Sequence, residues 1–521
     1  MEQYDVREDG VGIILPGTTE IKDFAFQNRT DLTSIEIPES VTQIGYGAFS
    51  GCTGLKSIEI PSSITEIEDY VFNDCSGLTD VKIPSSVTKI GNEAFGRCKN
   101  LVRIDIPSSV TKIGRWAFSS CYNITNMEIP SSVIEIGAGA FTGCQKLKKV
   151  TIPSSVTHID DNAFESCPEL ANIIVSPNNR VYDSRENCNA IIETASNCLI
   201  TGCKETKIPS SVTKIGRDAF FDCEQLYSIE IPSSITEIER FAFAHCVRLN
   251  GINLPQSLNE IGDGAFCGCK GLKYVKIPSS VTELGDLGFS LCTALQSVEI
   301  PSTIERIGKE AFVGCTSLES VKSYPGMAEG KQTVSRPKTN VEDGDELPYT
   351  EIGECAFENC VNLKNVEIPM VEGIGYKAFA GCTGLQKIII PSSVIALAPA
   401  AFYGCTGLTD VVVPDSVIVM GDEVFSECSA LKSIEIPSSV KYIGDSAFCG
   451  CINLSTIRFL GKVEQLGFYD DDDIRSVMVD LFGYCESLSK IIVPSKMKDY
   501  YVELLDGVGY KDKIIEQNAE L

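Results

Sequence analysis

Basic residues and histidine are scarce in this chain. Its 521 residues include 44 Lys and Arg against 71 Asp and Glu, and only 2 His, so the formal net charge is −27 at pH 7. A chain of this charge repels phosphate backbones and anionic membrane surfaces on average. We therefore expect no nucleic-acid partner and no membrane insertion. The acidity serves solubility first, and among partners it favours basic or neutral ones.

Long apolar segments are also missing. No run approaches the roughly 20 apolar residues that cross a bilayer. The first ten residues, MEQYDVREDG, have no basic head followed by an apolar stretch, so they do not resemble a secretory signal. On this basis the protein either stays in the cytoplasm or carries a leader that this version of the chain lacks.

Recognisable catalytic and cofactor motifs are absent as well. The chain has no G-x-x-x-x-G-K-[ST] phosphate loop and no dinucleotide fingerprint. Its two histidines, His158 and His245, occupy variable positions and nothing pairs them with a nucleophile. The sequence therefore nominates no catalytic, cofactor-binding or metal-binding residue, and we expect a protein that is not an enzyme and needs no cofactor.

What the chain has instead is an internal repeat. Phenylalanines mark it, mostly at steps of 23 residues, within the range typical of leucine-rich repeats. The marked positions are Phe26, Phe49, Phe72, Phe95, Phe118, Phe141, Phe164, Phe220, Phe243, Phe266, Phe289, Phe312, Phe357, Phe379, Phe402, Phe425, Phe448 and Phe482.

A single unit shows the role of each segment. Leu55, Ile58 and Ile60 follow the L-x-x-L-x-L pattern of a short strand with its large apolar residues in the core. Pro61 cannot donate a ladder hydrogen bond, so the strand ends there. The Ala-Phe-x-x-Cys stretch that follows suggests one turn of helix, in which Phe and Cys share a face. No unit can bury its apolar side alone, so units must stack.

The expected fold is therefore a leucine-rich-repeat solenoid of about 18 stacked turns. Short parallel strands form its concave sheet, and short helical or 3₁₀ turns form its convex side. An inserted hairpin and a C-terminal cap complete the expected architecture.

The repeat also resembles a known family. The segment Ile83–Ile104 contains Ile-Pro-Ser-Ser-Val-Thr-x-Ile-Gly-x-x-Ala-Phe-x-x-Cys-x-x-Leu-x-x-Ile, which is similar to the BspA-like class of leucine-rich repeats and recurs along nearly the whole chain. The resemblance implies a protein found mostly on bacterial surfaces and some protist surfaces, often as an adhesin. It also implies a protein partner such as a host or matrix protein.

Breaks in the period suggest the domain organisation. The step from Phe164 to Phe220 is 56 residues, and a second long step follows Phe312. A third break surrounds the acidic run Asp470–Asp473, which we expect to be a solvated turn and not a calcium loop. The expected parts are an N-terminal cap (1–20), repeat arrays (21–175, 208–322 and 349–496), an inserted hairpin module (176–207), a mobile loop (323–348) and a C-terminal cap (497–521).

Cysteine is abundant, with 23 residues, and all but the first repeat phenylalanine have a Cys three residues later. Equivalent positions in stacked turns have parallel Cβ directions, which suit a disulfide poorly. We expect these cysteines to be reduced core residues. Cys188, Cys198 and Cys203 in the insert could form one disulfide, whereas the absence of a C-x-x-C pair disfavours zinc.

The strand face is the surface left for binding. Between the inward isoleucines most repeats carry a charged or polar residue, but Ile389 and Val412 stand there in two consecutive repeats, flanked by Lys387 and Asp410. Exposed apolar neighbours favour an interaction site; the alternative is that a cap, a loop or a tighter superhelix covers them.

These features favour a non-enzymatic protein-binding module of the adhesin type. An intracellular scaffold or sensor of the same fold is the alternative. A carbohydrate-binding protein is less favoured, because the strand face offers chiefly Tyr274 for sugar stacking.

Overall fold

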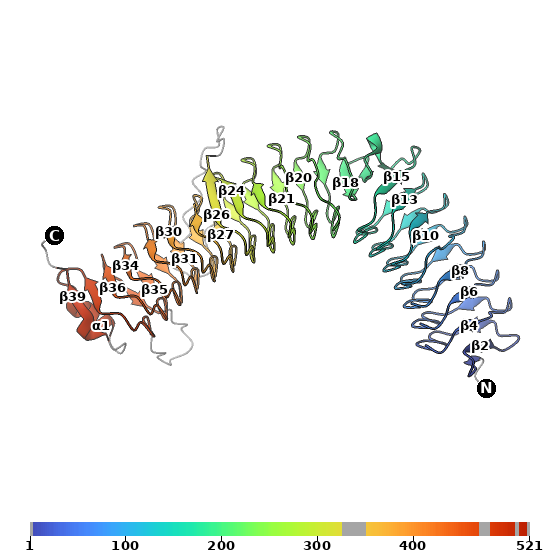
Figure 1. Ribbon diagram of the computed structural model, residues 1–521, viewed down its shortest axis with the longest axis horizontal. Helices are drawn as coiled ribbons and strands as arrows, with labels where there is room; N and C mark the ends of the chain where they lie inside the picture. The colour runs from blue at the N-terminus through green and yellow to red at the C-terminus, as the bar shows by residue number, and fades with distance from the viewer. Residues whose placement is uncertain (1–3, 326–350, 468–479, 506–509, 518–521) are drawn as a thin grey trace. The chain divides into compact units, whose positions relative to one another are not determined.

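The computed structural model describes residues 4–325, 351–467, 480–505 and 510–517. The chain divides into two compact units, residues 1–249 and 250–521, and each is built by stacking similar coils (Figure 1). Most coils contain three segments: a strand that follows the L-x-x-I-x-I pattern, a short return strand, and a turn segment that carries the phenylalanine. The chain makes about 20 coils.

The first segments stack into what we call the strand ladder. In the first unit its members are β2 (Val11–Ile14), β4 (Ser34–Ile35), β6 (Ser57–Glu59), β8 (Asp80–Lys82), β11 (Asn126–Glu128), β13 (Lys149–Ile152) and β15 (Asn172–Val175). In the second unit they are β22 (Tyr274–Lys276), β24 (Ser297–Pro301), β26 (Ser320–Tyr324), β28 (Asn365–Val366), β30 (Lys387–Ile389), β32 (Asp410–Val412), β34 (Ser433–Ile436), β36 (Thr456–Phe459), β38 (Lys490–Val493) and β39 (Ile514–Glu516). Paired strands are parallel and aligned at the repeat length, as Met127 with Val150.

The return strands, most of them two residues long, form a second parallel ladder. In the first unit these are β3 (Glu20–Ile21), β5 (Gln43–Ile44), β7 (Glu66–Ile67), β9 (Lys89–Ile90), β10 (Lys112–Ile113), β12 (Glu135–Ile136), β14 (His158–Ile159), β19 (Lys214–Ile215) and β20 (Glu237–Ile238). In the second unit they are β21 (Glu260–Ile261), β23 (Glu283–Leu284), β25 (Arg306–Ile307), β27 (Glu351–Ile352), β29 (Gly373–Ile374), β31 (Ala396–Leu397), β33 (Val419–Met420), β35 (Tyr442–Ile443) and β37 (Gln465–Leu466).

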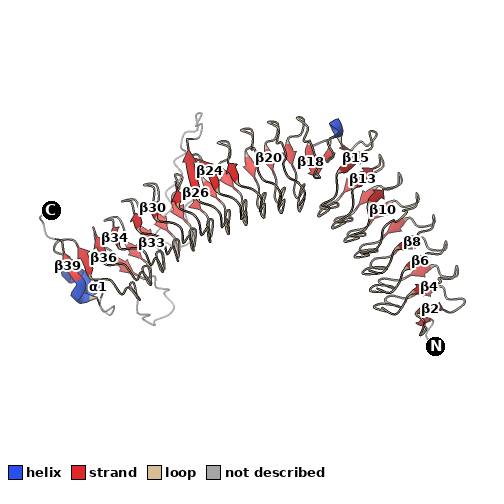
Figure 2. Cartoon of the chain, in the orientation of Figure 1, coloured by secondary structure: helices blue, strands red, loops and turns tan. Residues whose placement is uncertain are grey.

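The turn segment is not the helical turn that the Ala-Phe-x-x-Cys pattern suggests, and that expectation is wrong (Figure 2). In the coil of Phe118, the N–H groups of Trp116, Phe118 and Ser120 donate to carbonyls of the next coil at 2.7–2.9 Å. The intervening N–H groups donate three residues back within the same coil. Trp116 and Ser120 have positive φ values of 53° and 56°. Every second N–H therefore points along the stack, and this alternation requires positive φ values that a right-handed helix does not contain.

The repeat phenylalanines form a buried stack, which we call the phenylalanine spine. Phe118 lies 5.5 Å from both Phe95 and Phe141, with interplanar angles of 3° and 5°. In the second unit Phe379 lies 5.4 Å from Phe402 at an angle of 2°. Isoleucine, leucine and valine from the two ladders surround the rings with almost no exposure. The predicted apolar interior is confirmed.

The repeat cysteines do more than fill space. The thiol of Cys121 donates to the carbonyl oxygen of Phe95 in the preceding coil at 3.2 Å, and that oxygen also accepts the N–H of Cys98. The same thiol contact recurs along both units at 3.0–3.3 Å. Burial raises the pKa of Cys121 to about 12. Cysteine thus supplies a small apolar volume together with a weak donor for a second bond to the phenylalanine carbonyl.

The segment that interrupts the first unit contains three strands and one short helix. β16 (Tyr182–Asp183), β17 (Ile191–Glu193) and β18 (Cys198–Thr201) pair antiparallel in order, with the 3₁₀ helix η1 (Arg185–Asn187) between the first two. β18 then pairs parallel with β19 and so continues the return ladder. The thiols of Cys188, Cys198 and Cys203 are free, so the possible disulfide among them is not formed.

The two ends carry elements that differ from the repeat. β1 (Tyr4–Val6) pairs antiparallel with β2. At the other end α1 (Lys498–Leu504) and the 3₁₀ helix η3 (Lys511–Lys513) precede β39. The loop expected over 323–348 lies outside the described residues except for its start, where β26 extends to Tyr324. The acidic run Asp470–Asp473 also lies outside them.

The spine predicts a large local cost for Phe118→Ala. Removing a fully buried ring that stacks on two others should lower the free energy of unfolding by about 3–5 kcal/mol. Because coils contact mainly their neighbours, the unfolding transition should also broaden. Denaturant unfolding followed by circular dichroism measures both effects, and Tyr227→Ala, at a residue with 63% exposure, is the control. A Phe118→Ala profile that matches this control would contradict the interior placement of the ring.

The thiol contacts predict which cysteines react. In native protein, iodoacetamide should modify Cys267 and Cys449 first, because these two side chains are partly exposed while the others are buried. Cys98, Cys121 and Cys144 should react only after denaturation, and as free thiols. Mass spectrometry after alkylation without reductant tests this, and a disulfide linking any of these three would refute it.

Candidate functional site

The four residues singled out on the strand face lie together. Lys387 pairs with Asp410 and Ile389 with Val412 across the parallel strands β30 and β32. Ile389 is 57% exposed and Val412 is 49% exposed. Lys387 and Asp410 are also exposed. Within the described ranges, no cap or loop covers them. We call these four residues the strand-face patch.

The strand-face patch departs from the pattern of the same face elsewhere. Several equivalent cross-strand positions hold opposite charges, as Lys82 with Glu59 at 3.1 Å and Lys276 with Glu299 at 2.8 Å. Such pairs stabilise neighbouring strands by a few tenths of a kcal/mol up to about 1 kcal/mol. The exposed pair of Ile389 and Val412 lacks that electrostatic stabilisation and leaves apolar surface in contact with water.

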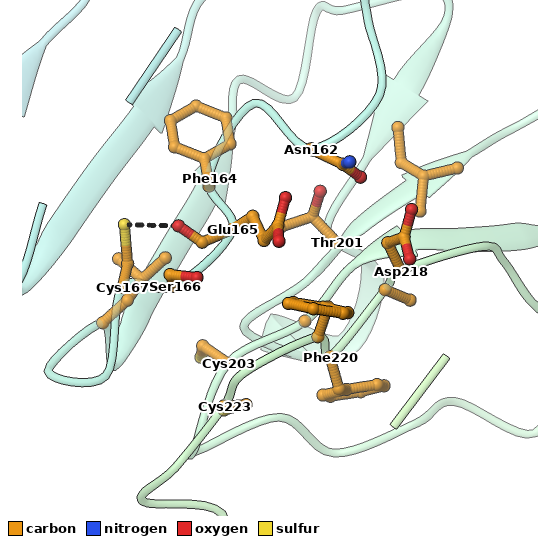
Figure 3. Close-up of a pocket in the computed structure, with 15 residues that line it drawn as sticks. Asn162, Phe164, Glu165, Ser166, Cys167, Thr201, Cys203, Asp218, Phe220 and Cys223 are labelled. Atoms are coloured by element: carbon orange, nitrogen blue, oxygen red, sulfur yellow. Dashed lines mark hydrogen bonds between the residues drawn. The ribbon is translucent and has the colours of Figure 1, made fainter. Parts of the chain in front are cut away.

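A second candidate is a cavity where the insert enters the first unit (Figure 3). Three segments line it: one coil, the end of the insert, and the next coil. The residues that matter here are Asn162, Glu165, Cys167, Thr201, Gly202, Cys203, Asp218, Phe220 and Cys223. Its volume is about 20 Å³, enough for a water molecule and too small for an organic substrate.

The insert creates the cavity by breaking the repeat. The N–H of Gly202 donates to the carbonyl of Ala219 at 2.7 Å, the acceptor that Phe164 would use if the two coils were adjacent. Among the described residues, Phe164 makes no hydrogen bond of that type to the next coil, and no ring contact joins it to Phe220. Here the spine is interrupted.

Three carboxylates gather at this interruption. Burial, followed by the charges of Asp218 and Asp222, raises the pKa of Glu165 to about 7. Burial also raises the pKa of Asp218, against the opposing effects of the nearby Arg217 and of a hydrogen bond from the Asn162 side chain. Figure 3 shows Glu165 and Asp218 reaching toward the same space from different coils.

The cavity's thiols lack the properties of a catalytic nucleophile. Burial raises the pKa of Cys223 to about 12 and that of Cys167 well above its usual value. Reactive cysteines need the opposite shift. The cavity marks an interruption of the coil stack, and its thiols do not have the lowered pKa of a reactive cysteine.

Among the residues that the structure describes, the two histidines join no cluster of catalytic or metal-binding type. The exposed side chain of His158 contacts that of Asp160 at 2.6 Å, and His245 lies edge-on to Phe221. Within the described ranges, no three His, Cys, Asp or Glu side chains are placed to hold a metal ion. None of the described helices is long and apolar enough to cross a membrane.

Sequence reasoning missed the carboxylate cluster. Glu165 stands at an ordinary variable repeat position, and its meeting with Asp218 depends on how the insert joins the two coils. The 56-residue step between Phe164 and Phe220 was the available signal, because an insert must interrupt the spine where it enters.

The cluster predicts that low pH stabilises the first unit. A carboxyl whose folded pKa is raised from 4.5 to about 7 binds a proton more readily when folded, so stability is present below pH 4.5 and lost as pH rises through 7. Because Glu165 is only half-buried, we expect a gain of about 1–2 kcal/mol between pH 8 and pH 5 after allowing for solvent screening. Glu165→Gln should be more stable than the native chain at pH 8 and should depend less on pH. Thermal unfolding at several pH values tests this, with Glu128→Gln, at an exposed residue, as the control. Equal pH profiles for native and Glu165→Gln protein would contradict it.

The chain resembles known proteins in sequence and in structure. The family described as "BspA type Leucine rich repeat region" matches residues 13–125, 66–192, 196–319 and 350–470. Among solved structures, a leucine-rich cell surface protein of Faecalibacterium prausnitzii is 32% identical, with a TM-score of 0.54, covering 63% of this chain and 94% of that one. The pneumococcal vaccine antigen PcpA is 22% identical, with a TM-score of 0.50, covering 68% of this chain and 92% of that one, and shares the fold.

A comparison with curated proteins finds no match. The family match nevertheless covers well over half of the residues, and the described coils have the parallel strands that the repeat implies. The chain therefore belongs to the BspA-type leucine-rich repeat family.

Proposed function

We propose that this protein is a non-enzymatic, protein-binding solenoid displayed on a bacterial surface, and that its strand-face patch is a contact site. The observation that carries the proposal is the exposed, in-register pair of Ile389 and Val412 on β30 and β32. Contiguous exposed apolar side chains with a polar rim are typical of interaction sites.

The surroundings of the pair favour a partner of particular chemistry. Asp410 lies beside it, and the exposed Glu367 and Glu435 occupy the equivalent positions in the repeats on either side. Lys387 is the basic member of the rim. Glu435 already pairs with Arg458 at 3.4 Å. A protein segment with an apolar side chain at its centre and a basic edge would bury the apolar pair and lie against Asp410 and Glu367.

The proposed location rests on relatedness. The Faecalibacterium prausnitzii protein is described as a cell surface protein, and it is similar to this chain over most of its own length. An antibody or protease applied to intact cells should therefore reach the protein. The alternative, an intracellular scaffold of the same fold, predicts that it becomes accessible only after lysis.

The patch is tested by Ile389→Glu combined with Val412→Glu. Because both side chains are exposed, the double variant should keep the native melting temperature and lose its partner, since two carboxylates replace the apolar contact. The measurement is quantitative mass spectrometry of proteins retained from host extracellular matrix and from cell lysate. A retained protein would then be purified and its dissociation constant measured, with an expected weakening of at least tenfold.

The matched control is Ile174→Glu. Ile174 occupies the equivalent strand-face position on β15 and is 42% exposed, so the variant adds the same kind of charge to a single apolar site. Retention of the same proteins at the same affinity by the double variant and the control would contradict the proposal.

A further inference from the structure

A row of aromatic side chains lies on the turn segments near the start of the first unit. Phe24 is 47% exposed, Tyr46 is 40% exposed and Tyr70 is half-buried. The ring centroids of Phe24 and Tyr46 are 5.3 Å apart, and those of Tyr46 and Tyr70 are 5.1 Å apart. These three residues, from three successive coils, form what we call the aromatic strip.

The strip occupies backbone positions that disfavour such residues. Phe24 and Tyr70 stand two residues before a spine phenylalanine, where φ is positive, at 58° and 62°. Gly47 holds this position in the coil between them, and a Cβ there would lie 3.0 Å from the Phe24 ring. Large side chains are uncommon at positive φ, and Phe24 is left 47% exposed. Backbone preference therefore does not explain these residues.

Carboxylates surround the strip. Asp23 precedes Phe24 and accepts the backbone N–H of Tyr46 at 2.8 Å. The hydrogen bond from the Tyr70 hydroxyl to Glu93 raises the pKa of Tyr70, and burial and the charges of Glu93 and Asp69 act in the same direction. Three carboxylates therefore lie at or beside the rings.

Other aromatic residues at the same coil position in this unit already hold a cation. The guanidinium carbon of Arg115 lies 5.0 Å from the ring centroid of Trp116, and that of Arg240 lies 4.8 Å from the ring centroid of Phe241. In the part of the chain that the structure describes, no cation lies over a ring of the strip.

From this contrast we propose that the aromatic strip is a second binding surface, and that it takes an arginine- or lysine-rich segment of a partner protein. The partner's cations would lie over the Phe24 and Tyr46 rings, as Arg115 lies over Trp116, and pair with Asp23, Asp69 and Glu93. Cation–π attraction and the carboxylates act together on the same groups. The chain's net charge of −27 draws such a segment toward the protein.

The ring geometry favours a cationic segment over a sugar or a second copy of this chain. Phe24 and Tyr46 meet edge to face at 70°, so they do not make the flat platform on which a pyranose ring stacks. A second copy would bring the same carboxylates against the strip, and like charges would then face each other.

The test is fluorescence anisotropy with a labelled (Arg-Gly)₅ peptide on the full chain at physiological ionic strength. Because any polycation binds an acidic protein to some extent, the decisive variant is Phe24→Leu combined with Tyr46→Leu, which keeps the charge and the apolar character but removes the two π faces that the cations would contact. Leucine is tolerated at the backbone position of Phe24, since Leu287 adopts φ 60° in an equivalent coil. Tyr227→Leu, at an exposed ring elsewhere in the same unit, is the matched control.

We expect the double variant to weaken peptide binding about five- to thirtyfold, and Glu93→Gln to weaken it as well, with no change for Tyr227→Leu. A peptide with citrulline in place of arginine should not bind. Equal affinity of the double variant and Tyr227→Leu for the peptide would overturn the proposal, because the peptide would then bind through the overall charge of the protein alone. Equal binding of the citrulline peptide would also overturn it, as would self-association that the double variant abolishes.

This surface belongs to the first unit and the strand-face patch to the second. Ile389→Glu with Val412→Glu should therefore leave the affinity for (Arg-Gly)₅ unchanged. The failure of one proposal can be told apart from the failure of the other.

Discussion

Alternate hydrogen bonding in the turn segments is the constraint on which the rest of the structure depends. Every second N–H donates to the next coil, and the intervening ones close tight turns within their own coil. This arrangement needs positive φ at two positions per coil, as at Trp116 and Ser120. It holds successive coils close enough for Phe118 to stack on Phe141 at 5.5 Å and for Cys121 to reach the carbonyl of Phe95. The ladder, the spine and the thiol contacts are three consequences of one backbone pattern.

The sequence predicts this stack well where a property repeats. A 23-residue period with Leu, Ile and Phe at fixed offsets requires that equivalent residues lie side by side, because no coil buries its apolar face alone. The parallel register of Met127 with Val150 and the burial of the repeat cysteines follow from the period. The turn conformation does not. Ala-Phe-x-x-Cys fits a helix as well as a ribbon of turns, since both bring residues three apart together. The competition between bonds within a coil and bonds between coils decides the outcome.

Functional positions are harder to predict because they are departures from the period. Ile389 and Val412 could be found because they replace charged residues at a position whose direction the strand alternation fixes. Glu165 and the aromatic strip could not be found in this way. Glu165 meets Asp218 only because the insert brings Gly202 to the carbonyl of Ala219. Phe24 and Tyr46 do not share a repeat position, yet their rings meet because Gly47 leaves room between them.

In a repetitive fold of this kind, different residues determine stability and recognition. The spine and the ladders use inward positions, which leaves strand-face and turn positions free to vary at little cost in stability. Where those positions hold opposite charges, as in Lys276 with Glu299, they satisfy each other and have little left for a partner. Where they hold an exposed Ile–Val pair, or aromatic rings over which no cation of the described residues lies, apolar surface or a ring face is left without a partner. The interior is nearly the same from coil to coil, so it does not mark a binding site. We therefore look for candidate binding surfaces where outward side chains lack a charge or ring partner within the chain.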